Sequence, residues 1–392
     1  MDLVIPDWRG AVEGLFTARL FGSETLLLPV AGKRIDGASD YSRLFARDTL
    51  LSAFTFSDLP HEATAHLLEN SLRYFAAHQG RKPDPFTNEE PGKTLHELEG
   101  IPLRGHNTLF SACDTVSLFL IGCARYARSA YFEQEAWDYL VPRMHAGLGY
   151  LRAHIEDGLF LEDPRHSGAK DFALLATYWR DYGIGGRRGR HLYYPCAFLL
   201  VQAQVVAALR ELLYLAKIKR FSGELARLEG ELKAARKAFL SFFGSGAAAP
   251  VAIDAKGPIH FVSTDPAHAL YYLEPDDVSY PYLCDAQDLL GDLKTPWGFK
   301  TWKRDKKIPA MNWEPERIWP WEHAFIAQGL KKHGAYHDFE DAISPARFLA
   351  ESGIPFTEFL ELKYGKPHAA GCHVQLWTCA YWAWVEQQHL PR

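Results

Sequence analysis

Two neighbouring segments of opposite hydrophobic character, residues 197–208 and 225–242, restrict the folds that this chain can adopt. The first reads AFLLVQAQVVAA and is apolar on nearly every side, which is typical of a helix enclosed by other helices. The second spaces its apolar residues three and four apart among charged ones, which indicates a helix with one face in water. An enclosed helix followed by an amphipathic one is the repeating unit of a double ring of helices. We therefore expect an all-α fold built as an α/α barrel.

The rest of the chain adds one small β element to this expectation. Residues 251–263 contain two β-rich runs around a glycine-containing turn, and they predict a hairpin insertion. No other segment resembles strands, and the sequence contains neither a low-complexity linker nor a repeat of fixed period. We expect residues 1–392 to form a single domain.

Charge and cysteine usage exclude several classes of function. A formal net charge of -5 offers no basic surface of the kind that nucleic-acid backbones require of their partners. The first residues are acidic where a secretory signal is basic, and no uninterrupted apolar run approaches the length of a membrane span. Six cysteines without a CxxC pair, and no HxxH spacing, indicate neither a disulfide framework nor a metal site. We expect a cytoplasmic protein with no cofactor, metal, nucleic-acid or membrane partner.

Dense clusters of acidic and basic residues lie between the predicted helices, in loops of the kind where binding and catalytic groups collect. Arg47 and Asp48 stand at the head of one apolar helical run, and Asp114 stands at the head of another. Each aspartate could simply cap its helix, or it could bind hydroxyl groups of a ligand. The segment TNEEPGKTLHELEG, which contains Glu97, has more carboxylates than a plain connection needs.

Aromatic residues accompany two further acidic clusters. Asp181 follows the run TYWR, where desolvation by Trp179 and its neighbours favours the protonated form that a general acid needs. Residues 309–323, PAMNWEPERIWPWEH, alternate tryptophan with glutamate at a helix entrance and include Trp319, Trp321 and Glu322. This alternation suits a carbohydrate subsite, because sugar rings stack on aromatic faces. The simpler interpretation is that these tryptophans pack the start of a helix.

These motifs, in the same order along residues 40–385, resemble those of the glycogen-debranching amylo-α-1,6-glucosidases of the six-hairpin glycosidase superfamily. FARDT resembles their WGRDT stretch, TYWRD resembles the TWMD stretch that carries the general acid, and RIWPWEH resembles their VWPW helix. GCHVQLWTCA, with Gln375 and Trp377, resembles their final GxxxQAWS helix. EEPGKTLHE and GHNTLFSACDT, the latter with His106, resemble loops that line the sugar subsite.

The resemblance implies an (α/α)6 barrel, inversion at the anomeric carbon, and a general base near the chain's end. Related α-glucosidases place a glutamate seven residues before a glycine in the loop that precedes the last helix. Glu358 and Gly365 match that spacing, whereas Glu361 does not and is the second candidate. We expect this segment to be an irregular loop.

Inverting hydrolysis needs one carboxylic acid to protonate the leaving oxygen and one carboxylate to activate water, about 6.5 to 9.5 Å apart. We assign these roles to Asp181 and Glu358. The remaining candidates would bind the sugar: Arg47, Asp48, Glu97, His106, Asp114, Trp179, Arg180, Trp319, Trp321, Glu322, Gln375 and Trp377. Typical debranching enzymes carry a large extra domain before the barrel, whereas here the first motif appears by residue 45. We therefore expect no separate N-terminal β-sandwich domain, and short oligosaccharides or small glycosides as substrates.

Two other functions fit the same expectations. Sugar epimerases of the N-acylglucosamine 2-epimerase type share this barrel and use paired histidines, and His96, His106 and His373 lie in candidate loops. A barrel that binds glycans without cleaving them is the non-enzymatic alternative. The sugar, its linkage and the oligomeric state are left open by the sequence.

Overall fold

The computed structural model describes residues 3–33, 42–57, 64–181, 183–184, 192–222, 225–244, 249–303, 317–335 and 339–389. The chain forms two compact units, which are described separately. The first unit contains residues 1–71, 262–271 and 286–392, and the second contains residues 72–261 and 272–285. Two helices run across the unit boundaries, α3 (Leu67–Ala77) and α9 (Tyr280–Leu293).

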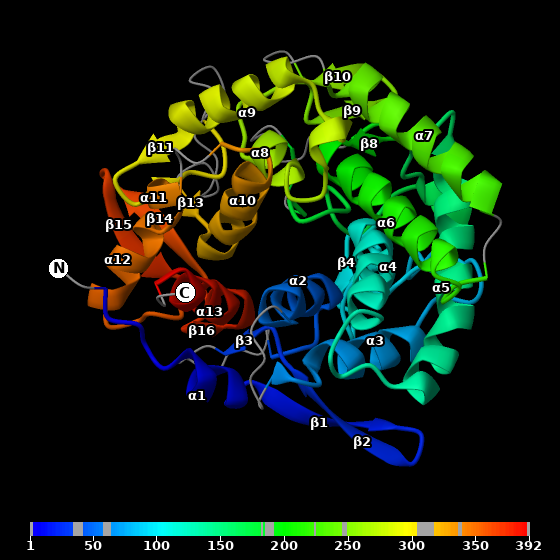
Figure 1. Ribbon diagram of the computed structural model, residues 1–392, viewed down its shortest axis with the longest axis horizontal. Coiled ribbons are helices and arrows are strands. Elements are labelled where there is room, and N and C mark those ends of the chain that lie inside the picture. The colour runs from blue at the N-terminus through cyan, green and yellow to red at the C-terminus, as the bar shows by residue number, and fades with distance from the viewer. Residues whose placement is uncertain are drawn as a thin grey trace. The chain divides into compact units, whose positions relative to one another are not determined.

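Four long helices form the body of the second unit (Figure 1): α4 (Asp114–Tyr126), α5 (Gln134–His154), α6 (Leu199–Lys217) and α7 (Leu225–Phe242). Helix α6 packs against α4 on one side and α7 on the other. It is buried over most of its length, whereas α7 buries only one stripe of leucine, alanine and phenylalanine residues. The predicted pairing of an enclosed helix with an amphipathic one is confirmed.

Gln202 is a buried amide in the middle of apolar α6. Its Nε2 donates to the carbonyl oxygens of Gly158 at 2.9 Å and Ala235 at 3.1 Å, and its Oε1 accepts from the N–H of Phe160 at 2.9 Å. Helix α6 is long and apolar enough to cross a membrane by length and composition alone, but polar residues such as Gln202 interrupt its apolar run and 83% of its apolar stretch is buried inside the protein. That burial and the satisfied amide are typical of a core helix.

Short strands and 3-10 helices complete the second unit. The predicted hairpin at residues 251–263 is confirmed as β9 (Ala252–Asp254) and β10 (Gly257–Ile259), and β8 (Ala197–Phe198) pairs with β9. Two smaller hairpins are formed by β4 (Pro102–Leu103) with β5 (His106–Asn107) and by β6 (Ile155–Glu156) with β7 (Leu159–Phe160). The 3-10 helices are η2 (Thr108–Phe110), η3 (Pro164–Ser167) and η4 (Pro275–Asp277).

The first unit is arranged around its C-terminal helix α13 (Leu376–His389), which packs against α1 (Trp8–Glu13), α2 (Ala46–Ser57) and α10 (Pro320–Lys332). Glu386 of α13 accepts from Trp8 Nε1 at 2.9 Å and from Arg9 through both carboxylate oxygens. The other helices are α8 (Asp265–Ala269), α11 (Phe339–Ala342) and α12 (Ser344–Glu351). Short strands of this unit are β3 (Gly32–Lys33), β11 (Lys294–Thr295), β12 (Gly298–Phe299), β13 (Arg317–Ile318) and β16 (Val374–Gln375).

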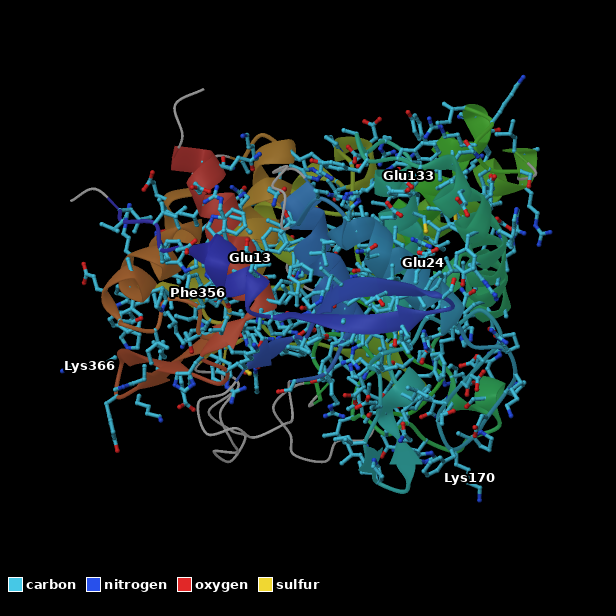
Figure 2. All side chains as sticks on the ribbon, turned by 90° about the horizontal axis from the view of Figure 1, so that it is seen from below. Glu13, Glu24, Glu133, Lys170, Phe356 and Lys366 are labelled. Carbon is cyan, nitrogen blue, oxygen red and sulfur yellow. The ribbon has the colours of Figure 1, made fainter. Side chains whose placement is uncertain are left out.

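The expectation that only residues 251–263 form strands is wrong. The first unit contains a hairpin of β1 (Phe16–Phe21) with β2 (Glu24–Pro29), whose turn lies beside Glu24 (Figure 2). Strands β14 (Phe359–Lys363) and β15 (Lys366–Ala370) form a second hairpin where an irregular loop was predicted (Figure 2, near Lys366). Tyr364 and Gly365 join them with φ of 52° and 74°, which is the geometry of a tight two-residue turn.

Candidate functional site

Asp48 lies in the first turn of α2, where the positive end of the helix dipole stabilises a carboxylate. The helix begins at Ala46, so Asp48 does not occupy the capping position. Gln375 Nε2 donates to Asp48 Oδ2 at 3.3 Å, which joins two sequence motifs that are 327 residues apart. Strand pairing places Gln375 opposite Gly32, where an added Cβ would lie 2.1 Å from Gln375 Oε1. Arg47, beside Asp48, is also buried.

Glu358 is buried just before β14 and is held by the backbone of a neighbouring turn. Its N–H donates to the Cys372 carbonyl at 2.9 Å, and its Oε2 accepts from the Cys372 N–H at 3.0 Å. Gly371 makes this approach possible, because a Cβ there would lie 2.3 Å from Glu358 Oε2. The φ of Gly371 is 80°, a conformation that favours glycine.

Glu361, the second candidate for the base, lies in a different environment. It occupies the middle of β14, opposite Arg317 on one neighbouring strand and His368 on the other. Its Oε2 is 2.8 Å from Lys363 Nζ, and its side chain is 20% exposed. The two glutamates therefore differ in kind: Glu358 is fixed by backbone, whereas Glu361 pairs with a surface lysine.

The three predicted tryptophans of this unit form one cluster. Trp377 stacks on Trp321 with centroids 5.3 Å apart, and it meets Trp319 edge-on at 5.3 Å. Phe359 lies 4.9 Å from Trp319, and Arg317 lies over Phe359 at 3.7 Å. Trp321 is buried, as the packing interpretation predicts, while Trp319 and Trp377 are half-buried and keep part of their surface exposed.

Glu322 is buried behind this cluster and binds two groups that the sequence did not indicate. Thr264 donates its hydroxyl to Glu322 Oε1 at 2.7 Å, and His268 Nδ1 lies 3.5 Å from the same oxygen. The His268 ring also meets Trp321 edge-on at 5.4 Å. Glu322 is thus linked to the tryptophan cluster through His268. The upstream part of the predicted Trp-Glu segment, residues 309–316, lies outside the described residues.

In the second unit, the start of α4 is joined to the TYWRD segment. The N-cap of α4 is Cys113, and Asp114 is the first helical residue and is buried. The Cys113 N–H donates to the Thr177 carbonyl at 2.7 Å, and the Thr177 hydroxyl lies 3.5 Å from Cys113 Sγ. Capping by its side chain therefore does not explain an aspartate at position 114.

The TYWRD segment itself is irregular, and its conformation depends on side-chain packing. Tyr178 stacks on Phe198 at 4.6 Å, and the Arg180 guanidinium lies over the Trp179 ring at 4.2 Å. The carbonyl of Asp181 accepts from the N–H of Leu175 at 3.1 Å and of Ala176 at 3.4 Å. Asp181 is half-buried at the end of this packed segment.

The loops predicted to line a sugar subsite border a cavity of about 580 Å³. Its lining is His78, Thr87, Leu95, Leu98, Glu99, Gly100, Asn107, Leu109 and Phe110. Neither Glu97 nor His106 belongs to that lining. Glu97 is buried and accepts from the Thr108 hydroxyl, and His106 Nδ1 lies 3.1 Å from the Pro85 carbonyl oxygen.

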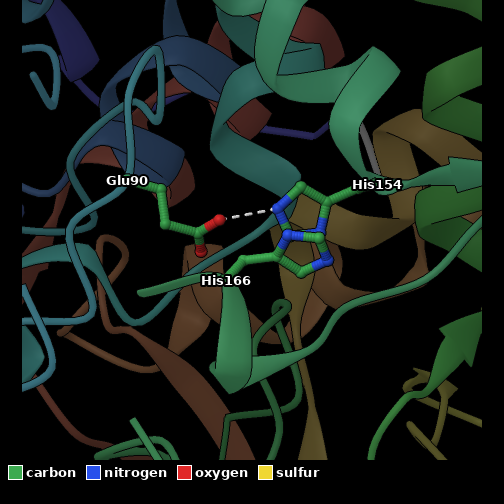
Figure 3. Close-up of side chains that lie close together, drawn as sticks. All are labelled: Glu90, His154 and His166. Carbon is green, nitrogen blue, oxygen red and sulfur yellow. Dashed lines mark hydrogen bonds and ion pairs between the residues drawn. The ribbon is translucent and has the colours of Figure 1, made fainter. Parts of the chain in front are cut away.

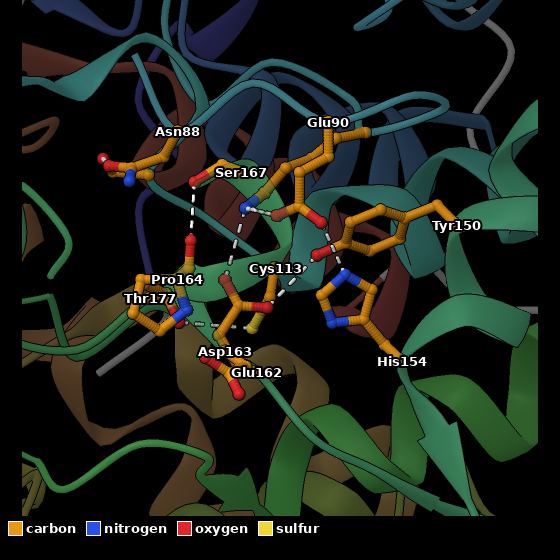
Figure 4. A network of polar contacts seen from close by, with 12 residues as sticks. Asn88, Glu90, Cys113, Tyr150, His154, Glu162, Asp163, Pro164, Ser167 and Thr177 are labelled. Carbon is orange, nitrogen blue, oxygen red and sulfur yellow. Dashed lines mark hydrogen bonds and ion pairs between the residues drawn. The ribbon is translucent and has the colours of Figure 1, made fainter. Parts of the chain in front are cut away.

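A buried ionic network in the second unit was missed by sequence reasoning (Figure 4). Lys93 Nζ lies 3.2 Å from Glu90 Oε1 and 3.3 Å from Glu162 Oε1. The Tyr150 hydroxyl donates to Glu162 Oε2 at 3.1 Å, and His154 Nε2 lies 2.7 Å from Glu90 Oε2. Lys93 is the lysine of the carboxylate-rich segment TNEEPGKTLHELEG, which was the one local signal.

The pKa values of this network favour charged partners. Burial by itself lowers the pKa of Lys93, but Glu162 and Glu90 raise it above its ordinary value. Burial likewise opposes the charge on His154, and the hydrogen bond to Glu90 raises the pKa of His154 overall. Glu90 shows the complementary change, because Lys93 and His154 outweigh its burial and lower its pKa.

The sequence matches no protein-family model and no curated protein. The structure, however, is similar to solved structures of proteins named as glycosidases. GH63 mannosylglycerate hydrolase from Thermus thermophilus matches with a TM-score of 0.64 and 13% identity, covering 97% of this chain and 98% of the other. That protein has been solved with Tris and D-glycerate and with glucose.

Two further structures show the same likeness. Neutral trehalase from Saccharomyces cerevisiae matches with a TM-score of 0.60 and 10% identity, covering 100% of this chain and 81% of the trehalase. A rhamnosidase from Klebsiella oxytoca matches with a TM-score of 0.57 and 15% identity, covering 89% and 59%. At such low identity the likeness establishes the fold alone. The chain therefore has the fold of the six-hairpin glycosidases, the all-α (α/α)6 barrel that its motifs predict.

Proposed function

We propose that this chain is an inverting glycoside hydrolase that cleaves an α-glucosidic bond in a short oligosaccharide or small glycoside. The observation that carries the proposal is the likeness, over nearly the whole of both chains, to a protein named mannosylglycerate hydrolase. Fold alone does not determine chemistry, so the proposal depends equally on the two carboxylates.

Glu358 suits the general base because one of its oxygens is fixed. The Cys372 N–H holds Oε2 at 3.0 Å, and such a donor stabilises the carboxylate form, which is the form that accepts a proton from water. The position of the carboxylate is further limited by Gly371, which packs directly against it. Glu361 is less suited, since a lysine ammonium already pairs with it at 2.8 Å.

Asp181 is proposed as the general acid. Its backbone is fixed by two N–H donors, from Leu175 and Ala176, and it directly follows the stacked pair of Trp179 and Arg180. A carboxylic acid must reach the leaving oxygen from one fixed direction, and a packed backbone provides that orientation. We assign sugar binding to motif residues in the same unit as each carboxylate: Arg47, Asp48, Gln375, Trp319 and Trp377 in the first unit, and Asp114 in the second.

A small substrate is favoured by comparison with the mannosylglycerate hydrolase. That protein is covered over 98% of its length, and it has been solved with D-glycerate and with glucose. We therefore place glucosylglycerate and mannosylglycerate in the substrate panel beside isomaltose, maltose and trehalose.

The first experiment follows sugar release and its initial anomer by proton NMR. Release of the glycone as the β-anomer from an α-linked substrate supports inverting hydrolysis, whereas its initial release as the α-anomer contradicts inversion. With trehalose, inversion gives one β-glucose and one α-glucose, because the leaving glucose keeps its configuration. Interconversion of free sugars without hydrolysis would instead support the epimerase alternative. Saturable sugar binding without turnover would support a non-catalytic barrel.

Variants of the carboxylates test the assignment of roles. We expect Asp181→Asn and Glu358→Gln each to lower kcat by about 10²-fold or more, because each removes a proton-transfer group. Glu361→Gln is the matched control, since it alters a neighbouring glutamate that pairs with a surface lysine, and it should keep near-parental turnover. If Glu361→Gln abolishes hydrolysis and Glu358→Gln does not, the base is Glu361.

A further inference from the structure

Three side chains from three separate segments of the second unit meet at the edge of the ionic network, and two of them, Glu90 and His154, belong to it (Figure 3). Glu90 comes from the loop after α3, His154 ends α5, and His166 lies in η3. One ligand-type atom from each lies within 4.8 Å of the others. The rings of His154 and His166 are 4.1 Å apart.

The orientation of His154 is fixed on both sides of its ring. Nδ1 lies 2.9 Å from the Leu161 carbonyl oxygen, which accepts a hydrogen bond and so requires the proton on Nδ1. Nε2 lies 2.7 Å from Glu90 Oε2. Nε2 and Oε2 therefore face one another, and a metal ion that replaced the proton between them would be bound by both atoms.

The buried groups around this contact are two carboxylates, one ammonium and one hydroxyl. Glu90 and Glu162 are both buried, and Lys93 is the buried cation that contacts both. Tyr150 contributes a neutral hydroxyl to Glu162. Lys93 contacts Oε1 of Glu90, whereas Oε2 of Glu90 faces His154 Nε2.

The nearby pair of Asp163 and Arg165 adds no net charge to the cluster. Arg165 binds both carboxylate oxygens of Asp163, so this pair is neutral as a whole. The exposed His166 is the remaining group at the opening of the cluster, and it gives an ion access from solvent.

We propose that Glu90, His154 and His166 bind one divalent transition-metal ion, for which Zn²⁺ is the best chemical match. Two imidazoles and one carboxylate are an established zinc ligand set, with a water in the fourth position. Imidazole ligands also disfavour Mg²⁺ and Ca²⁺, which prefer oxygen. The Leu161 carbonyl on Nδ1 is the kind of second contact that orients zinc-binding histidines.

Such an ion would join the Glu90 loop, the end of α5 and η3, and we expect it to stabilise the second unit. The inference does not depend on glycoside hydrolysis. It replaces the expectation of no metal site, which came from the absence of HxxH spacing. Glu90 and His154 are 64 residues apart, so no local spacing could reveal them.

The test is a titration of chelator-treated, full-length protein with ZnCl₂ by isothermal calorimetry, with thermal unfolding measured in parallel. We expect saturable binding of one Zn²⁺ per chain and a Tm that rises with ZnCl₂ concentration, because the ion binds the folded state. MgCl₂ over the same range should give neither. Absence of saturable 1:1 binding would overturn the proposal.

A variant of the exposed ligand separates metal binding from folding. His166→Asn removes one ligand without altering the buried network, and we expect it to weaken Zn²⁺ binding by about tenfold or more. His260→Asn is the matched control, because His260 is exposed and lies outside the cluster. Equal Zn²⁺ affinity in His166→Asn and the parent would also overturn the proposal, provided that their Tm values in EDTA agree.

Discussion

His154 in the second unit and His323 in the first are both buried, yet their surroundings favour opposite charge states. In each ring Nδ1 lies against a backbone carbonyl oxygen. Nε2 of His154 faces the Glu90 carboxylate, which raises its pKa, whereas Nε2 of His323 accepts the Phe299 N–H at 2.8 Å. Burial lowers the pKa of His323 below its ordinary value. The group that faces Nε2 therefore determines which charge state each histidine favours.

The same contrast extends to the carboxylates of the two units. Glu90 and Glu162 are stabilised by the opposite charge of Lys93, whereas Glu358 is stabilised by a backbone N–H and the close fit of Gly371. An opposite charge stabilises Glu90 and Glu162, whereas a backbone hydrogen bond and close packing fix Glu358. We therefore expect the loss of Lys93 and the loss of Gly371 to have different effects on the protein.

Removal of the Lys93 charge should have the largest effect on stability. Lys93→Met leaves two carboxylates buried near each other, and we expect a loss of about 3–5 kcal/mol in the free energy of unfolding, measured by urea denaturation. Lys303→Met, which breaks the exposed pair with Asp292, should cost less than about 1 kcal/mol. Equal losses in the two variants would show that the buried network is not held by charge.

A methyl group at Gly371 tests whether shape holds Glu358. Gly371→Ala combines an unfavourable φ with a clash against Glu358 Oε2, and we expect a loss of about 1–3 kcal/mol in stability and a drop in kcat. Gly365→Ala is the matched control: its φ of 74° is similar, but nothing lies within 4 Å of the added carbon. Gly365→Ala should lose stability because of the unfavourable φ, but it should keep the parental kcat.

The smallest expected effect is on the pH dependence of stability, to which His323 contributes. Its pKa is lowered, so the folded protein binds this proton less readily than the unfolded chain, whose pKa is the ordinary 6.5. The stabilisation is complete above pH 6.5 and is lost as the pH falls from there towards the folded-state pKa, by about 1.4 kcal/mol for each pH unit between the two pKa values. His323→Gln should flatten this slope in urea unfolding at pH 5 to 8. An unchanged slope would show that other groups cause the pH dependence of stability.

Local patterns explain which parts of the fold were predictable from the sequence. The characters of α6 and α7 are set by residues within each helix, so their pairing could be predicted. The β14–β15 hairpin was missed because FLELK is short and its apolar residues do not alternate strictly. Its turn, Tyr364-Gly365, was the signal that would have found it.

Residues of the candidate site could be predicted only where they belong to a motif that resembles one in a known family. Arg47, Asp48 and Gln375 came from resembling motifs, and the structure places Asp48 and Gln375 in contact. The Glu90–His154 contact joins residues with no motif and no fixed spacing. Such a pair is set by tertiary packing, and sequence periodicity carries no information about it.

The apolar surface of α6 is covered in stages as the chain is synthesised. Its apolar surface is covered by α4, which is synthesised before it, and by α7, which is synthesised after it. Until the ribosome has released α7, Gln202 lacks the Ala235 carbonyl and the part of α6 that α7 covers is exposed. We therefore expect a chain truncated between α6 and α7 to aggregate through this uncovered apolar surface.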